Sequence, residues 1–256
     1  MNWRTFAALL ARDAHVARRN VATLVLQTML QPMLFVFVFG RVLISSGMMA
    51  ASYKGLLLPG IMAVTMTITG IWAVAMPLIA EFQFTREIED RLLAPMRIEW
   101  LAVEKILFGM LQALVAGAVV LPTGWLVLGH GVGITINQPV LWLTVVFLVA
   151  IFSSAGGLAL GCSVGQTQIG LMFSMVIAPM IFFGCVYYPW SALNSFPVIQ
   201  KLVLLNPLVY ASEGLRGTMV PQVHHLPTFL VAGVLLAVDV LLIVAGLKQF
   251  NRKAVS

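Results

Sequence analysis

The residues from Val140 to Ser163 read VLWLTVVFLVAIFSSAGGLALGCS and include no Asp, Glu, Lys or Arg. A helix needs about 20 mainly apolar residues to cross the ~30 Å hydrocarbon core of a bilayer, and this stretch supplies them. On both sides of it, stretches of the same character recur: Val21–Ile44, Leu56–Ala80, Leu101–Leu128, Ile169–Tyr188 and Thr228–Leu247. The sequence therefore predicts an all-α membrane protein with six transmembrane helices.

The composition of the 256-residue chain points to lipid as its solvent. Hydrophobic residues make up 61% of it and charged residues 9%, whereas a soluble domain has roughly 45–50% and about 25%. A soluble protein with so few polar residues could not cover its hydrophobic core with a polar surface. The first 20 residues carry arginines and only short apolar runs, so we expect no cleavable signal peptide. Residues 21–256 then form one six-span domain.

The positions of the basic residues predict the orientation, because cytoplasmic loops are enriched in Lys and Arg. With both termini cytoplasmic, the inner segments hold eleven of the 15 basic residues: Arg4, Arg12, Arg18, Arg19, Arg86, Arg91, Arg97, Lys105, Lys248, Arg252 and Lys253. The outer segments hold the other four: Arg41, Lys54, Lys201 and Arg216. We therefore expect both termini in the cytoplasm. Cys162 and Cys185 then lie near opposite faces, and no disulfide between them is expected.

Small residues at a spacing of four predict two close helix–helix contacts, since they let helix backbones approach. The fourth span carries Ser153, Gly157, Gly161 and Gly165, and the third carries Gly109, Ala113 and Gly117. We interpret both stripes as packing faces.

Residues 2–19 form a candidate amphipathic interface helix within an N-terminal segment of residues 1–20. Its apolar side gathers Trp3, Phe6, Ala7, Leu10, Ala14 and Ala17, and its polar side gathers Arg4, Arg12, His15 and Arg19. A helix divided in this way lies in the membrane interface. Either it only anchors the chain, or it also contacts a cytoplasmic partner.

The predicted cytoplasmic loop from Glu81 to Pro95 reads EFQFTREIEDRLLAP and holds four of the nine acidic residues. Phe84, Ile88 and Leu92 recur at helical spacing, and Pro95 ends the helix. A short charged helix with an apolar ridge suits docking into a groove of another protein. An ordinary solvated loop is the other interpretation.

The predicted outer segment, residues 189–226, is too apolar for a free loop. The stretches Val198–Leu205 and Leu208–Leu215 are interrupted by Asn206 and Pro207, and they fit two short helices that enter the outer leaflet and return. Irregular backbone at that depth needs a covering of protein or a water-filled cavity. The segment is therefore either a gate or a lid that seals the bundle.

Motifs for catalysis are missing from the sequence. None of the five lysines completes a GxxxxGK[ST] phosphate loop, and no metal-ligand spacing appears around His224 and His225. Three aspartates, Asp13, Asp90 and Asp239, do not make the acidic cluster that a magnesium-dependent lipid transferase needs. We therefore expect neither an enzyme nor a metal or cofactor in this chain.

Asp239 is the one charge at the centre of a predicted span, within LLAVDVLL. Intramembrane acids are costly and commonly face the bundle interior, so such a residue is a functional hypothesis. A structural carboxyl that is hydrogen-bonded across helices is the other interpretation.

Three motifs, in order along the chain, resemble a known family. They are EIEDRLLAPM at 87–96, FFGCVYYPW at 182–190, and LNPLVY at 205–210 followed by Glu213 and Arg216. The first resembles the coupling segment of ABC-2 type permeases, the membrane subunits of bacterial ABC exporters such as the nodulation-J and daunorubicin-resistance-like group. The second resembles the exit of the family's fifth span, and the third resembles its Asn-Pro motif before the last span. Many members carry a glycine just upstream of the coupling acid, where this chain has Thr85, Arg86 and Glu87.

The resemblance implies a location in the bacterial inner membrane, a second permease subunit, and two separate ATPase subunits that bind ATP and magnesium. It implies that two elements grip the ATPase: the interface helix, with Trp3, Phe6, Arg12 and Arg19, and the coupling helix, with Glu87, Ile88, Glu89, Asp90, Arg91 and Leu92. It also implies a re-entrant gate, with Asn206, Pro207, Tyr210, Glu213 and Arg216.

The substrate expected from the resemblance is hydrophobic or amphipathic: a drug, a lipid or a glycolipid. Aromatic residues available to line an apolar path are Trp72, Phe152, Phe173, Phe182 and Phe183. The alternative function is a stand-alone secondary transporter or channel that uses Asp239 as its ion or proton site.

Overall fold

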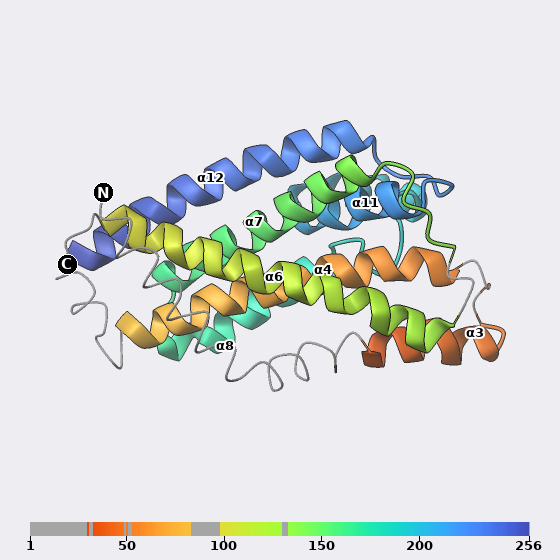
Figure 1. Cartoon of the computed structure of the whole chain (residues 1–256), viewed down its shortest axis with the longest axis horizontal. Helices are drawn as coiled ribbons and strands as arrows, with labels where there is room; N and C mark the ends of the chain where they lie inside the picture. The colour runs from red at the N-terminus through yellow and green to blue at the C-terminus, as the bar shows by residue number, and fades with distance from the viewer. Residues whose placement is uncertain are drawn as a thin grey trace.

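The computed structural model describes residues 30, 33–48, 50, 53–82, 98–129 and 133–255. Within these ranges the chain is helical and contains no strand. The long helices run side by side along the longest axis of the molecule, as Figure 1 shows. Four of them are long and apolar enough to cross a membrane: α4 (Tyr53–Ala80), α6 (Ile98–Leu128), α7 (Pro139–Ser163) and α12 (Thr228–Val255).

Helices α4 and α7 form the interior of the bundle: α4 packs against α6 and α7, and α7 also packs against α12. A Cβ atom added to Gly157 of α7 would lie 2.7 Å from the carbonyl oxygen of Ile71, and one added to Gly161 would lie 3.0 Å from the Cα of Ala75. On α6, a Cβ atom at Gly117 would lie 2.7 Å from the sulfur of Met66. Small residues therefore let both neighbours approach α4 closely.

Gly165 is the exception to the predicted stripe on the fourth span. Helix α7 ends at Ser163, and Val164 is extended, with φ −104° and ψ 136°. Gly165 follows in a short turn, where its N–H donates to the side-chain oxygen of Gln168 at 3.2 Å. The prediction of Gly165 as a helix-packing residue is wrong for that reason: the helix stops before reaching it.

Two shorter apolar helices lie where the first and fifth spans were predicted. Among the described residues, four of the six predicted spans are thus helices long and apolar enough to cross a membrane. One runs from Met33 to Ser45 and contains η1 (Val38–Val42) and α3 (Leu43–Ser45). The other, which we call the fifth helix, runs from Ile169 to Phe182. It is made of α8 (Ile169–Met172), η4 (Phe173–Ile177) and α9 (Ala178–Phe182), after η3 (Gln166–Gln168).

The fifth helix ends at Phe182 instead of continuing to Tyr188 as predicted. Cys185 adopts a left-handed backbone with φ 51°, which no helix continues through. Gly184 lies tightly against Leu208, because a Cβ atom there would be 2.6 Å from that side chain. The chain therefore turns sharply within a stretch that its apolar composition predicted as one continuous span.

A helical hairpin follows, which we define as residues 197–219. After η5 (Trp190–Ser195) come α10 (Pro197–Leu202), η6 (Val203–Leu205) and α11 (Pro207–Met219). Helix α11 packs against α4, α7 and α12 at one end of the bundle, which we call the hairpin end.

The opposite end is called the loop end, because α4 leaves the bundle there and α6 enters it. The predicted interface helix and nearly all of the predicted coupling helix lie outside the described residues. This applies to Trp3, Phe6, Arg12 and Arg19, and to Glu87, Ile88, Glu89, Asp90, Arg91 and Leu92. Of the predicted loop, Glu81 and Phe82 are described, and they extend α4 by a π-helical turn.

Candidate functional sites at the two ends of the bundle

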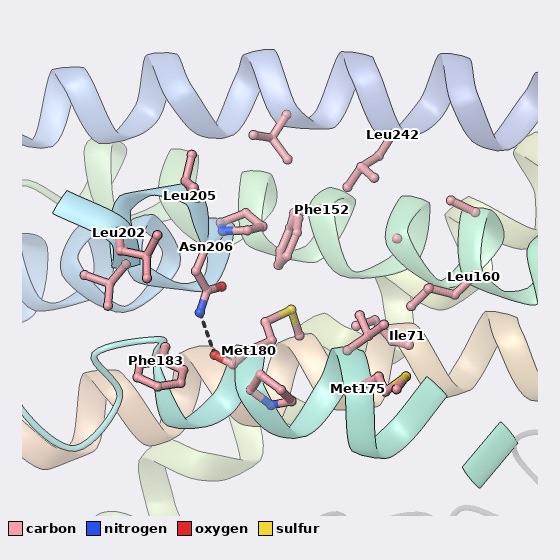
Figure 2. A pocket seen from close by; sticks show the side chains of 17 residues that line it. Ile71, Phe152, Leu160, Met175, Met180, Phe183, Leu202, Leu205, Asn206 and Leu242 are labelled. Carbon is pink, nitrogen blue, oxygen red and sulfur yellow. Dashed lines mark hydrogen bonds between the residues drawn. The ribbon is translucent and has the colours of Figure 1, made fainter. Parts of the chain in front are cut away.

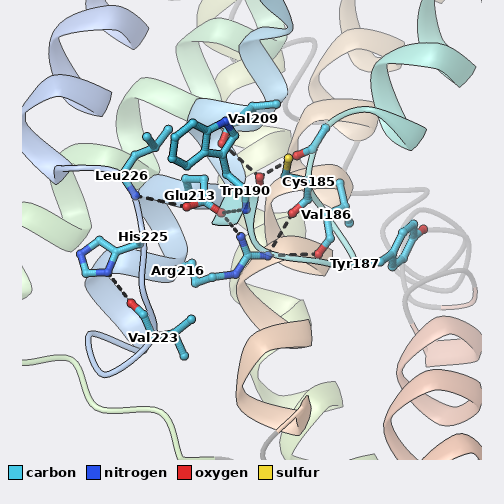
Figure 3. A network of polar contacts seen from close by, with 12 residues as sticks. Cys185, Val186, Tyr187, Trp190, Val209, Glu213, Arg216, Val223, His225 and Leu226 are labelled. Carbon is cyan, nitrogen blue, oxygen red and sulfur yellow. Dashed lines mark hydrogen bonds and ion pairs between the residues drawn. The ribbon is translucent and has the colours of Figure 1, made fainter. Parts of the chain in front are cut away.

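A buried ion pair lies at the hairpin end. Glu213 and Arg216 stand one turn apart on α11, and both are fully buried. Residues three apart on a helix share a face, and here the Nη1 of Arg216 donates to the Oε1 of Glu213. The structure therefore brings together the two charges of the predicted gate (Figure 3).

The ion pair holds the loops on both sides of the hairpin. The Nη2 of Arg216 donates to the carbonyl oxygens of Cys185 at 3.0 Å and Val186 at 3.3 Å. Glu213 accepts from the backbone N–H of Trp190 at 3.0 Å and of Leu226 at 3.2 Å. Buried charges need such additional hydrogen bonds to offset their desolvation. The pair thus joins the exit of the fifth helix to the entrance of α12.

The break in the hairpin is also fixed by hydrogen bonds. The side-chain oxygen of Asn206 caps α11 by accepting from the N–H of Leu208 at 3.0 Å, and its Nδ2 donates to the carbonyl of Met180 at 2.7 Å. Pro207 occupies the first helical position, where its missing N–H costs nothing. Tyr210 donates to the carbonyl of Leu204 at 2.9 Å.

A second buried ion pair, at the loop end, was missed by the sequence analysis. The Nζ of Lys105 on α6 lies 2.8 Å from the Oε1 of Glu81, and both side chains are less than a tenth exposed. The two residues belong to different helices and are 24 positions apart. The sequence feature that could have predicted this pair is the presence of opposite charges near the end of one span and the start of the next.

The C-terminal helix joins this cluster. The ring of Phe82 meets the ring of Phe250 edge to face, with centroids 5.7 Å apart, and the Nζ of Lys253 lies 4.9 Å from the Phe82 centroid. The Oγ of Ser163 at the end of α7 donates to Gln249 at 2.7 Å. The end of α4 is thus tied both to α6 and to α12.

Asp239 lies on α12 and is 2% exposed. Among the described residues, neither of its carboxyl oxygens has a hydrogen-bond partner. The side chain therefore faces protein, as intramembrane acids commonly do.

Other chemistry is sparse in the part of the chain that the structure describes. It contains no group of three or more His, Cys, Asp or Glu residues placed to hold a metal ion. Cys162 and Cys185 are both free and buried. His225 makes a local contact, with its Nδ1 2.7 Å from the carbonyl oxygen of Val223.

The sequence is similar to known transport proteins over most of its length. The model of the ABC-2 type transporter family matches residues 4–220. The inner membrane transport permease YadH of Escherichia coli (strain K12) is 25% identical over 216 residues, which cover 84% of this chain and 82% of that protein. The YadH proteins of Escherichia coli O157:H7 and Shigella flexneri match to the same extent. The chain therefore belongs to the ABC-2 type transporter family, as a multi-pass transmembrane permease.

Proposed function

We propose that the chain is the permease subunit of an ATP-driven exporter in a bacterial inner membrane. The family match over residues 4–220 carries this proposal, and the relatives named inner membrane transport permeases support it. The chain has no phosphate loop of its own. Two ATPase subunits bind the ATP and magnesium, and they work with two permease subunits whose six spans start and end in the cytoplasm.

Coupling to the ATPase runs through the predicted coupling helix, residues 81–95. This segment follows α4 and precedes α6 in the chain, and the Glu81–Lys105 pair joins the ends of these two helices. A displacement of the segment would therefore move α4 and α6 together. ATP shifts the transporter between states only if the ATPase contacts differ between them, and the predicted contacts are those of the coupling helix and the interface helix.

The hairpin is the gate of this transporter. Its ion pair and the Asn206–Met180 hydrogen bond attach it to the exit of the fifth helix. A movement of the fifth helix would therefore carry the hairpin with it. The exported molecule is hydrophobic or amphipathic, in keeping with the many large apolar side chains that the helices expose.

Charge reversal in the coupling helix tests the function. We expect the double variant Glu89→Lys and Asp90→Lys to insert normally but to lose most of the stimulation that the permease gives to its ATPase in vesicles. The control is Lys201→Glu, a charge reversal at an exposed position of α10, which should leave the stimulation unchanged. Stimulation at the wild-type level in the double variant would reject the docking assignment.

A second candidate function is a secondary transporter, favoured by the buried carboxyl of Asp239, which has no partner among the described residues. In that case, Asp239→Asn would abolish proton-driven transport in vesicles that contain no ATPase. Transport that requires the ATPase and survives this substitution would favour the exporter.

A further inference from the structure

A cavity of about 560 Å³ lies beneath the hairpin, between the fifth helix, α7 and α12. Figure 2 shows Phe152 and Leu242 on one side of it, Met175 and Met180 on the other, and Asn206 at one end. On α7 its lining runs from Phe152 to Leu160, which is ~12 Å at 1.5 Å per residue. The cavity is therefore elongated along the membrane-crossing helices.

The lining offers almost nothing to a polar ligand. Among the described residues that line it, Asn206 has the only polar side chain. The amide nitrogen of Asn206 donates to Met180, and its oxygen accepts from Leu208. Sugars and charged headgroups need hydrogen-bonding partners when they are buried. A glycan is therefore a poor occupant of this cavity.

The cavity is continuous with apolar surface that a membrane protein exposes to lipid. Leu205 is 82% exposed and Met175 is 74% exposed, and both line the cavity. Val176 and Phe183 line it as well, and each is about half exposed. In a chain that crosses the bilayer, such side chains contact acyl chains.

Physical chemistry limits what fills an apolar hollow of this kind. Water does not occupy a site without polar partners. If the hollow is empty, the side chains that line it lack van der Waals contacts on that side. A flexible hydrocarbon chain that lies along the helices avoids both penalties.

We propose that this cavity binds one acyl chain of a bilayer phospholipid. The chain enters from the lipid-facing side between the fifth helix and α12, and its headgroup stays outside the cavity. The bound chain touches both Met180 of the fifth helix and the 202–207 turn of the hairpin, so it supports the attachment between them. This inference depends on membrane insertion and not on the proposed ATP-driven export.

Photolabelling of the full-length protein tests the proposal. The probe is phosphatidylcholine with a diazirine at the end of one acyl chain, in vesicles of phosphatidylethanolamine and phosphatidylglycerol. We expect label at Met175, Met180 and Leu242 in excess of label at Leu111 and Val115, which are exposed on α6 away from the cavity.

A matched pair of variants on α12 sharpens the test. Val238 lines the cavity, whereas Val240 is 54% exposed and does not. Val238→Phe should fill the cavity and reduce the label at Met175 and Met180 about tenfold, while Val240→Phe should leave it unchanged. If Val238→Phe fails to insert, Ala159→Phe fills the same space from α7.

Three results would overturn the proposal. They are equal label over all exposed apolar positions of the wild type, undiminished label in Val238→Phe, and disulfide cross-linking of Val238→Cys to a second copy of the chain. The last result would mean that protein covers the cavity. Since all readouts come from the permease without ATPase, a failure here leaves the exporter hypothesis to its own test.

Discussion

At the hairpin end, two single residues neutralise each other's charge inside the protein, so a substitution at either one should be costly. Arg216 lies in a predicted outer segment, yet it is fully buried and paired with Glu213. Breaking a buried pair by removing one partner leaves an uncompensated charge, which costs about 3–5 kcal/mol. Arg216 is therefore a structural centre as well as a member of the proposed gate.

Replacing Arg216 with Met should lower the free energy of unfolding by about 3–5 kcal/mol. Glu213 would stay buried without its cation, and the carbonyls of Cys185 and Val186 would lose their donor. Thermal unfolding of the purified chain in detergent measures the loss, with Lys201→Met at an exposed site as the control. Equal unfolding temperatures for the two variants would contradict this role.

The ion pair at the loop end allows a charge-swap test. Lys105→Met should destabilise the chain by about 3 kcal/mol, because it leaves Glu81 largely buried without this partner. The swap of Glu81→Lys with Lys105→Glu should recover part of that loss, since the attraction is restored. Unfolding in detergent reports the stability, and ATPase stimulation in vesicles reports coupling. A swap as damaging as the single change would count against the pair.

Helix packing shows how neighbouring glycines differ in their surroundings. Gly157 faces the backbone of α4, whereas the nearest atoms to a Cβ at Gly156 are 3.9 Å away, on Ile71 and Leu242. Side chains can shift, but the carbonyl of a buried helix cannot move without breaking its own hydrogen bond. The close approach of α7 to α4 therefore requires glycine at 157 and not at 156.

Alanine at each of these glycines tests that difference. Gly157→Ala should destabilise the chain by about 1–3 kcal/mol through overpacking. Gly156→Ala should be neutral or slightly stabilising, because alanine favours a helix by up to ~1 kcal/mol over glycine. Paired unfolding curves in detergent give both values. A loss in Gly156→Ala equal to that in Gly157→Ala would refute the assignment of the packing face.

Each end of the whole molecule contains a buried ion pair, and the proposed topology assigns each end to one side of the membrane. In intact cells, a membrane-impermeant maleimide should label Lys201→Cys at the hairpin end. It should label Arg252→Cys, at the loop end, only after the cells are permeabilised. The native cysteines are buried, so they give little background. The opposite labelling pattern would reverse the proposed orientation.

The sequence by itself determined that the chain is helical and which stretches form its long helices. The hydrocarbon core offers no hydrogen bonds to backbone groups, so each membrane crossing needs a continuous apolar helix. Such a helix can be recognised from one local stretch of the sequence. The predicted Leu56–Ala80 and Val140–Ser163 agree with α4 and α7 to within three residues at each end.

Tertiary structure alone decided the end of the fifth helix at Phe182, the Glu81–Lys105 pair and the cavity beneath the hairpin. Each depends on segments that are far apart in the chain: Arg216 draws in the carbonyls of Cys185 and Val186, and α7 and α12 meet the hairpin around a hollow. The missing phosphate loop was visible in the sequence, but contacts between distant segments were not. The spacing of apolar residues indicates which face of a helix is apolar. Only the tertiary structure determines which other segment, or lipid, that face contacts.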